Sequence, residues 1–72
     1  MMSKDEVALL VDRVAQDVAV ELGLADPEKV DEKAMWLAYD RLWKVDKLSV
    51  ELQSDRFKVK RALQDAARRA EG

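Results

Sequence analysis

Apolar residues recur at intervals of three and four over the first third of the chain. This stripe consists of Val7, Leu10, Val11, Val14, Val18 and Leu22. Residues of a helix advance by about 100° each, so the stripe lies along one face. Ser3 and Glu6 match a capping box, and Gly23 follows the stripe, where a left-handed cap favours glycine. The pattern predicts a helix over 4–22.

A second helix is predicted to begin at Pro27, with Asp26 as its N-cap. The loop over 23–26 is short, so the first two helices should be antiparallel neighbours. Helical spacing of apolar residues then continues to Ala70 with little interruption. In one compact domain the chain must break at Ser49 or Ser54, either of which can cap a helix. A break near Ser49 gives helices over 27–47 and 50–70.

Two other interpretations of the second half remain open. One continuous helix over 27–70 would be about 66 Å long and would need a coiled-coil partner to bury its stripe. A short hairpin is the other, because 48–52 and 57–60 alternate between apolar and polar residues. A hairpin is disfavoured because the turn lacks glycine and two isolated strands are marginally stable. We therefore predict one all-α domain over 1–72, an antiparallel three-helix bundle with helix 2 at its centre.

The middle of the predicted second helix is apolar on two sides. One face carries Val30, Ala34, Leu37, Ala38, Leu42, Val45 and Leu48. The nearly opposite face carries Trp36, Tyr39 and Trp43. A helix that is apolar on both sides must be covered on both, by its own chain or by another. Because Trp and Tyr are enriched where interfaces concentrate their energy, these three aromatic residues are the predicted partner-binding residues. Burial against the third helix is the competing interpretation.

Length and composition favour association with another chain. Seventy-two residues lie near the lower limit for a stable single core, and the chain has neither cysteine for a disulfide nor histidine for a structural zinc site. A protein partner or a homo-oligomer would supply the missing stabilisation. The longest apolar run, over 7–11, is too short to span a membrane, and acidic residues precede it, unlike in a secretory signal. We expect a cytoplasmic protein that does not bind membranes.

Catalytic chemistry finds few suitable residues. The chain lacks His, Cys, Thr and Asn, and each of its three serines fits a helix cap. Nucleophilic triads and histidine acid–base catalysis are therefore excluded. The carboxylates of Glu28, Asp31 and Glu32 lie on an early helical turn, where we expect a solvated face rather than a metal site or a catalytic pair. With no glycine-rich phosphate loop, the sequence indicates a non-enzymatic protein without metal, cofactor or small-molecule substrate.

Charge gives the main alternative function. Residues 1–40 carry four basic and ten acidic side chains, and 41–72 carry nine basic and five acidic. The candidate nucleic-acid contacts in the last helix are Arg56, Phe57, Lys60, Arg61, Arg68 and Arg69. Basic residues around an aromatic ring can hold a phosphate backbone and stack on a base. A solvated face that balances the acidic helices is the simpler explanation. Nucleic-acid binding is therefore the second candidate.

Residues 16–24 look like the first helix and turn of a helix-turn-helix motif. The pattern departs after the turn, where Lys29 occupies a position that should be apolar. Four of the seven residues over 26–32 are acidic, and these charges would repel DNA phosphates. The motif is rejected. The sequence favours a small protein–protein interaction module that self-associates through the aromatic residues of its second helix.

Overall fold

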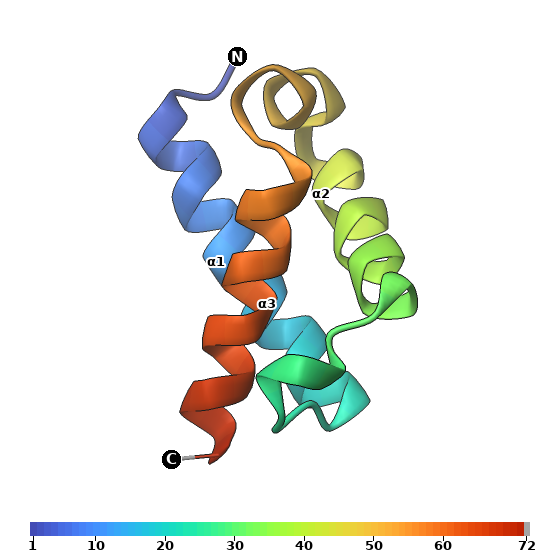
Figure 1. Ribbon diagram of the computed structural model, residues 1–72. Coiled ribbons are helices and arrows are strands. Elements are labelled where there is room, and N and C mark those ends of the chain that lie inside the picture. Colours follow the sequence, from blue (N-terminus) through green and yellow to red (C-terminus); the bar gives the residue numbers. More distant parts are fainter. Residues whose placement is uncertain (72) are drawn as a thin grey trace.

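The computed structural model describes residues 1–71, which form three helices packed side by side (Figure 1). Helix α1 spans Lys4–Leu22, α2 spans Glu32–Gln53 and α3 spans Arg56–Glu71, with a short 3₁₀ turn, η1, at Pro27–Lys29. The described residues contain no strand, and α2 and α3 are separate helices. The all-α three-helix bundle is thus confirmed, and both the hairpin and the continuous helix are excluded.

Local signals set both ends of α1. The Ser3 hydroxyl accepts a hydrogen bond from the Glu6 amide at 3.2 Å, and the Glu6 carboxylate accepts one from the Ser3 amide at 3.0 Å. At the other end Gly23 is left-handed with φ of 64°, and the Leu24 amide donates to the Ala19 carbonyl at 2.8 Å. This Schellman ending closes the helix after its last stripe residue. The predicted bounds of α1 are confirmed.

The start of α2 differs from the prediction. Asp26 and Pro27 begin only the turn η1, and the α-helix starts five positions later, at Glu32. Between them Val30 is extended, with φ of −72° and ψ of 106°, and it is buried. The Asp31 carboxylate then accepts a hydrogen bond from the Ala34 amide at 3.0 Å. The extended Val30 thus separates η1 from α2, and Asp31, the second aspartate, caps the new helix.

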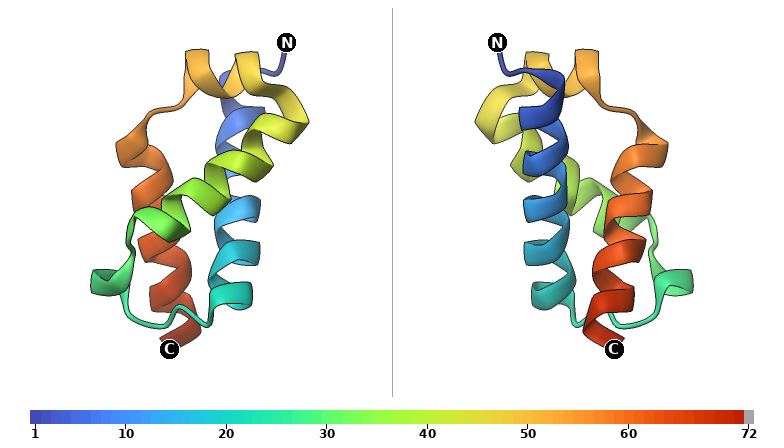
Figure 2. Two further views of the ribbon diagram at one scale, coloured as in Figure 1. Left: turned by 90° about the vertical axis from the view of Figure 1, so that its right-hand side faces the viewer. Right: turned by 90° about the vertical axis from the view of Figure 1, so that its left-hand side faces the viewer.

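The end of α2 also differs, because the helix is kinked at Asp46, whose φ of −161° and ψ of 89° are not helical. The Asp46 carboxylate accepts hydrogen bonds from the Ser49 amide at 3.1 Å and the Ser49 hydroxyl at 2.8 Å. Asp46 thus caps the last part of α2, which turns across the end of the bundle beside the N-terminus (Figure 2). Ser49 is buried and is not an N-cap. The helix changes direction at Asp46, three residues before the predicted break near Ser49, and Asp46 takes the capping position. The chain also breaks at Ser54, the other predicted position. Ser54 ends α2 and does not cap α3, because the Asp55 carboxylate accepts the hydrogen bond from the Lys58 amide at 2.9 Å.

The kink changes which residues of α2 are buried. Val45, Leu48 and Leu52 continue the predicted apolar face, yet 59%, 57% and 64% of their surfaces are exposed. Ser49 and Val50 are buried in their place. The Ser49 hydroxyl accepts a hydrogen bond from the Met2 amide at 2.9 Å, which fastens this segment to the start of the chain. Val45 and Leu48, which were expected in the core, therefore lie on the surface.

Helix α1, rather than α2, makes the most extensive contacts in the bundle. It packs along α3 and against α2, whereas α2 and α3 share a smaller contact. Alanines buried on α1 and α3 are Ala15, Ala19, Ala62, Ala66 and Ala67. Small side chains let helices approach closely, and α2 crosses the other two obliquely (Figure 2). Helix α1 therefore occupies the central position that was expected for helix 2, and much of the surface of α2 is exposed.

Candidate protein-binding surface

Trp36, Tyr39 and Trp43 form one aromatic face on the straight part of α2. The ring centroids of Trp36 and Trp43 are 6.2 Å apart with the planes at 76°, an edge-to-face contact. Tyr39 and Trp43 are 5.4 Å apart and tilted by 37°. Such pairs attract one another beyond the area they bury. The helical spacing therefore brings together the three residues that the sequence predicted to share a face.

The three rings are not equally covered. Trp36 has 63% of its surface exposed, whereas Tyr39 and Trp43 are half-buried and pack against the core. The indole N–H of Trp43 is buried and has no hydrogen-bond acceptor among the described residues. Burial is also the main reason that the pKa of Tyr39 is raised, with the Asp55 charge adding to it. Tyr39 and Trp43 are thus part of the packed fold, whereas Trp36 lies against Trp43 and is mostly exposed to solvent.

A groove of about 340 Å³ runs beside the aromatic face. It is lined by Glu32, Met35, Trp36, Tyr39, Trp43 and Arg56. Arg56, at the start of α3, pairs with Glu32 at 3.2 Å near the start of α2. Beyond the kink, the Lys47 ammonium lies 5.5 Å from the centre of the Trp43 ring, within cation–π range. The face is therefore apolar in its middle, with Glu32 and Arg56 at one end and Lys47 at the other.

The predicted basic surface of α3 is divided among three directions. Arg56 faces the aromatic groove, and Arg69 donates to the Gln16 side chain of α1 at 3.4 Å. A shallow depression brings the other candidates together, namely Phe57, Lys60, Arg61 and Arg68. Phe57 is 85% exposed, so it is not tucked under a neighbouring helix. Arg68 pairs with Asp65 at 2.8 Å, which reduces the positive charge of this depression.

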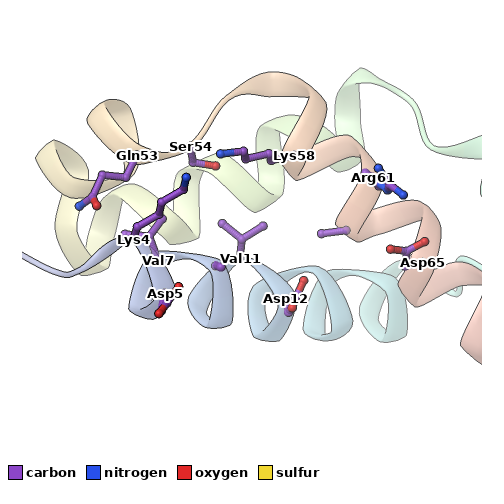
Figure 3. Close-up of a pocket in the computed structure, with 12 residues that line it drawn as sticks. Lys4, Asp5, Val7, Val11, Asp12, Gln53, Ser54, Lys58, Arg61 and Asp65 are labelled. Atoms are coloured by element: carbon purple, nitrogen blue, oxygen red, sulfur yellow. The ribbon is translucent and has the colours of Figure 1, made fainter.

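A further groove, of about 350 Å³, opens where the start of α1 meets the start of α3 (Figure 3). Its floor is apolar and includes Val7 and Val11. Charged residues on its lining are Lys4, Asp5, Asp12, Lys58, Arg61 and Asp65. Three cations and three carboxylates leave no net charge to select an ion. The sequence pattern gave no signal for this groove, because its lining comes from helices that meet only in the folded chain.

The described residues contain no group of three carboxylates, histidines or cysteines placed to hold a metal ion. Glu28, Asp31 and Glu32 are exposed, as expected for a solvated face. No helix in the described part of the chain combines the length and apolar character that crossing a membrane requires. Comparison with models of protein families, with curated proteins and with solved structures finds no match to the chain. Function must therefore be argued from the surfaces above.

Proposed function

We propose that the protein is a non-enzymatic protein–protein interaction module that binds through the aromatic face of α2. The observation that carries this proposal is the exposure of 63% of Trp36 directly above the half-buried Tyr39 and Trp43. Tryptophan and tyrosine are among the residues that most often dominate binding energies. Leaving so large an apolar ring in water costs free energy that a partner would recover.

The support beneath Trp36 makes it suited to binding. Trp43 contacts the Trp36 ring edge-to-face and is itself held by the core. An anchor that is already positioned loses less conformational entropy when it binds. The charged residues at the two ends, Glu32, Arg56 and Lys47, resemble the polar rim around the apolar centre of an interface.

The test compares three alanine variants. The free energy of unfolding of Trp36→Ala should lie within about 1 kcal/mol of the wild-type value. That of Trp43→Ala should be lower by up to about 3 kcal/mol, because the Trp43 ring is part of the packing. Val20→Ala, at an exposed apolar residue of α1, is the matched control. The solution mass of each folded variant reports self-association. Each variant is also immobilised to test whether it retains a bound protein. The proposal requires either self-association or a bound protein that Trp36→Ala loses and Val20→Ala keeps.

Two results would contradict the proposal. If Trp36→Ala unfolded the protein, Trp36 would be a structural residue. If neither self-association nor any bound protein depended on Trp36, the aromatic face would have no binding role.

Nucleic-acid binding through α3 is the second candidate, favoured by the exposure of Phe57 beside Lys60, Arg61 and Arg68. Contacts with phosphates weaken steeply as salt rises, whereas apolar contacts do not. We expect single-stranded oligothymidine to bind no more tightly than the ~10⁻⁴–10⁻⁶ M of non-specific contacts at physiological salt. Tighter, salt-sensitive binding that an Arg61→Glu, Arg68→Glu double variant abolished would place this function first.

A further inference from the structure

We infer that the partner of the aromatic face is a second copy of this chain. In this dimer the two α2 helices run antiparallel about a two-fold axis, and Trp36 of each copy lies opposite Trp43 of the other. The inference rests on the proposed function and specifies its partner. It is carried by the order of charges along the aromatic face and by the groove beside it.

Glu32 and Lys47, at the two ends of the face, have opposite charges in this register. Within its own chain Glu32 also pairs with Arg56 at 3.2 Å, and Lys47 lies 4.0 Å from Glu51, so the contact between copies shares these exposed charges. Glu32 precedes Trp36 by four residues, and Lys47 follows Trp43 by four. When the tryptophans of the two copies face each other, Glu32 of each copy therefore lies opposite Lys47 of the other. Lys47 remains on this face despite the kink, because its ammonium lies 5.5 Å from the Trp43 ring centre. Two-fold symmetry forms the contact twice.

Other registers bring like charges together. If Trp36 lay opposite Trp36 in an antiparallel pair, Glu32 would face Asp40, which follows Trp36 by four residues. If the helices ran parallel, Glu32 would face Glu32 and Lys47 would face Lys47. Like charges placed together at an interface oppose the wrong arrangement. Of the three arrangements compared, only the one in which Trp36 meets Trp43 brings Glu32 opposite a basic residue.

The groove gives the exposed ring a place to lie. It has a volume of about 340 Å³, and its aromatic lining consists of Tyr39 and Trp43 together with Trp36 of the same copy. Trp36 of one copy reaches the groove of the other when it lies opposite Trp43, so each copy both inserts a ring and accepts one. This reciprocal contact covers the two exposed tryptophans with apolar surface.

The available area indicates a weak dimer. A standard interface buries about 800 Å² on each partner, roughly a sixth of the 4889 Å² that this chain exposes. Because the aromatic face occupies only one side of one helix, we expect it to bury less than that. We therefore expect a dissociation constant in the micromolar range or weaker.

Reciprocal charge reversal tests the register. Glu32→Lys alone places Lys opposite Lys47, and Lys47→Glu alone places Glu opposite Glu32, so each variant should be monomeric. An equimolar mixture of the two variants restores both opposite-charge contacts. Sedimentation equilibrium from about 10 µM to 1 mM should show dimers for the wild type and for the mixture, with at least about tenfold tighter association than in either variant alone. Lys58→Glu on α3 is the charge-matched control and should associate like the wild type.

Each contrary result has a distinct meaning. If Glu32→Lys and Lys47→Glu each still formed dimers, and adding Trp36→Ala removed them, the aromatic contact would stand and the register would be wrong. A mixture that associates no better than its components would overturn the register as well. If the wild type were monomeric at 1 mM but bound a different protein through Trp36, the inference that the partner is a second copy would be wrong. The proposed function would remain intact. Melting temperatures of all variants show whether the charge changes have altered the fold.

Discussion

Helices α1 and α2 have similar apolar spacing but different fates in the fold. In α1 the four valines of the six-residue stripe are buried, Leu10 is half-buried and only Leu22, at the end of the helix, is exposed. In α2 the early part of the face is buried, yet Val45 and Leu48 are exposed. The two helices differ in that α2 is kinked at Asp46 and α1 is straight. Apolar periodicity thus predicts burial only as far as the helix keeps one direction.

A similar contrast exists within the aromatic face. Trp36 and Trp43 are seven residues apart on the same side of α2, yet Trp43 is supported by the core and Trp36 is mostly in water. Trp43 packs against the core and has the Lys47 ammonium 5.5 Å from its ring centre, whereas 63% of the Trp36 surface stays exposed. A shared helical face therefore does not mean a shared role.

The largest effect should come from comparing two leucines of α2. Leu42 is fully buried before the kink, and Leu52 is 64% exposed after it. Leu42→Ala should lower the free energy of unfolding by about 2–5 kcal/mol, since it leaves a cavity in the core. Leu52→Ala should change it by no more than about 0.5 kcal/mol. Urea denaturation measures both, and equal losses would show that the end of α2 packs as its periodicity predicts.

A smaller effect should come from Ser49, which joins the kink to the N-terminus. Ser49→Ala leaves the Met2 amide and the Asp46 carboxylate without the Ser49 hydroxyl, and should cost about 1–3 kcal/mol. Ser54→Ala is the matched control, because the Ser54 hydroxyl has no hydrogen-bond partner among the described residues. Thermal unfolding should separate the two variants. Equal melting temperatures would mean that the contact between Met2 and Ser49 does not hold the kink.

The smallest effect should be the pH dependence of the stability that Asp46 contributes. Hydrogen bonds from the Ser49 amide and then from its hydroxyl lower the pKa of Asp46. A carboxylate with a lowered pKa in the folded state contributes stability above its unfolded pKa, about 3.9, and loses it as the pH falls through the folded value. The difference in melting temperature between the wild type and Asp46→Ala should therefore shrink below about pH 4. Glu6, whose pKa is also lowered, is present in both proteins and cancels. A constant difference from pH 7 to 2 would contradict the capping role of Asp46.

The sequence predicts those features that depend on neighbouring residues. Ser3, Glu6 and Gly23 set the ends of α1 through contacts within a few positions, and helical spacing alone places Trp36 beside Trp43. These predictions are confirmed. The predictions that the structure contradicts, the capping role of Ser49 and the burial of Leu48 among them, involve a kink that is fastened by a hydrogen bond to Met2, 47 positions away from Ser49.

Long-range contacts also explain what was missed at the candidate sites. Arg56 joins the aromatic groove through Glu32, which is 24 positions away, and Arg69 turns toward Gln16, which is 53 positions away. Both arginines look like members of one basic surface when the sequence is read along a single helix. Only the packing of α3 against its neighbours shows that Phe57, Lys60, Arg61 and Arg68 remain together.

Acrylamide quenching of single-tryptophan variants tests most directly the claim that Trp43 belongs to the fold and Trp36 to an interface. Trp43→Phe leaves only Trp36, and Trp36→Phe leaves only Trp43. In dilute protein, Trp36 should be readily quenched and Trp43 protected, with blue-shifted emission. In concentrated protein, Trp36 should become protected while Trp43 changes little. Trp36 protected at both concentrations would place it in the core, and Trp36 equally quenched at both would show that no second copy covers it.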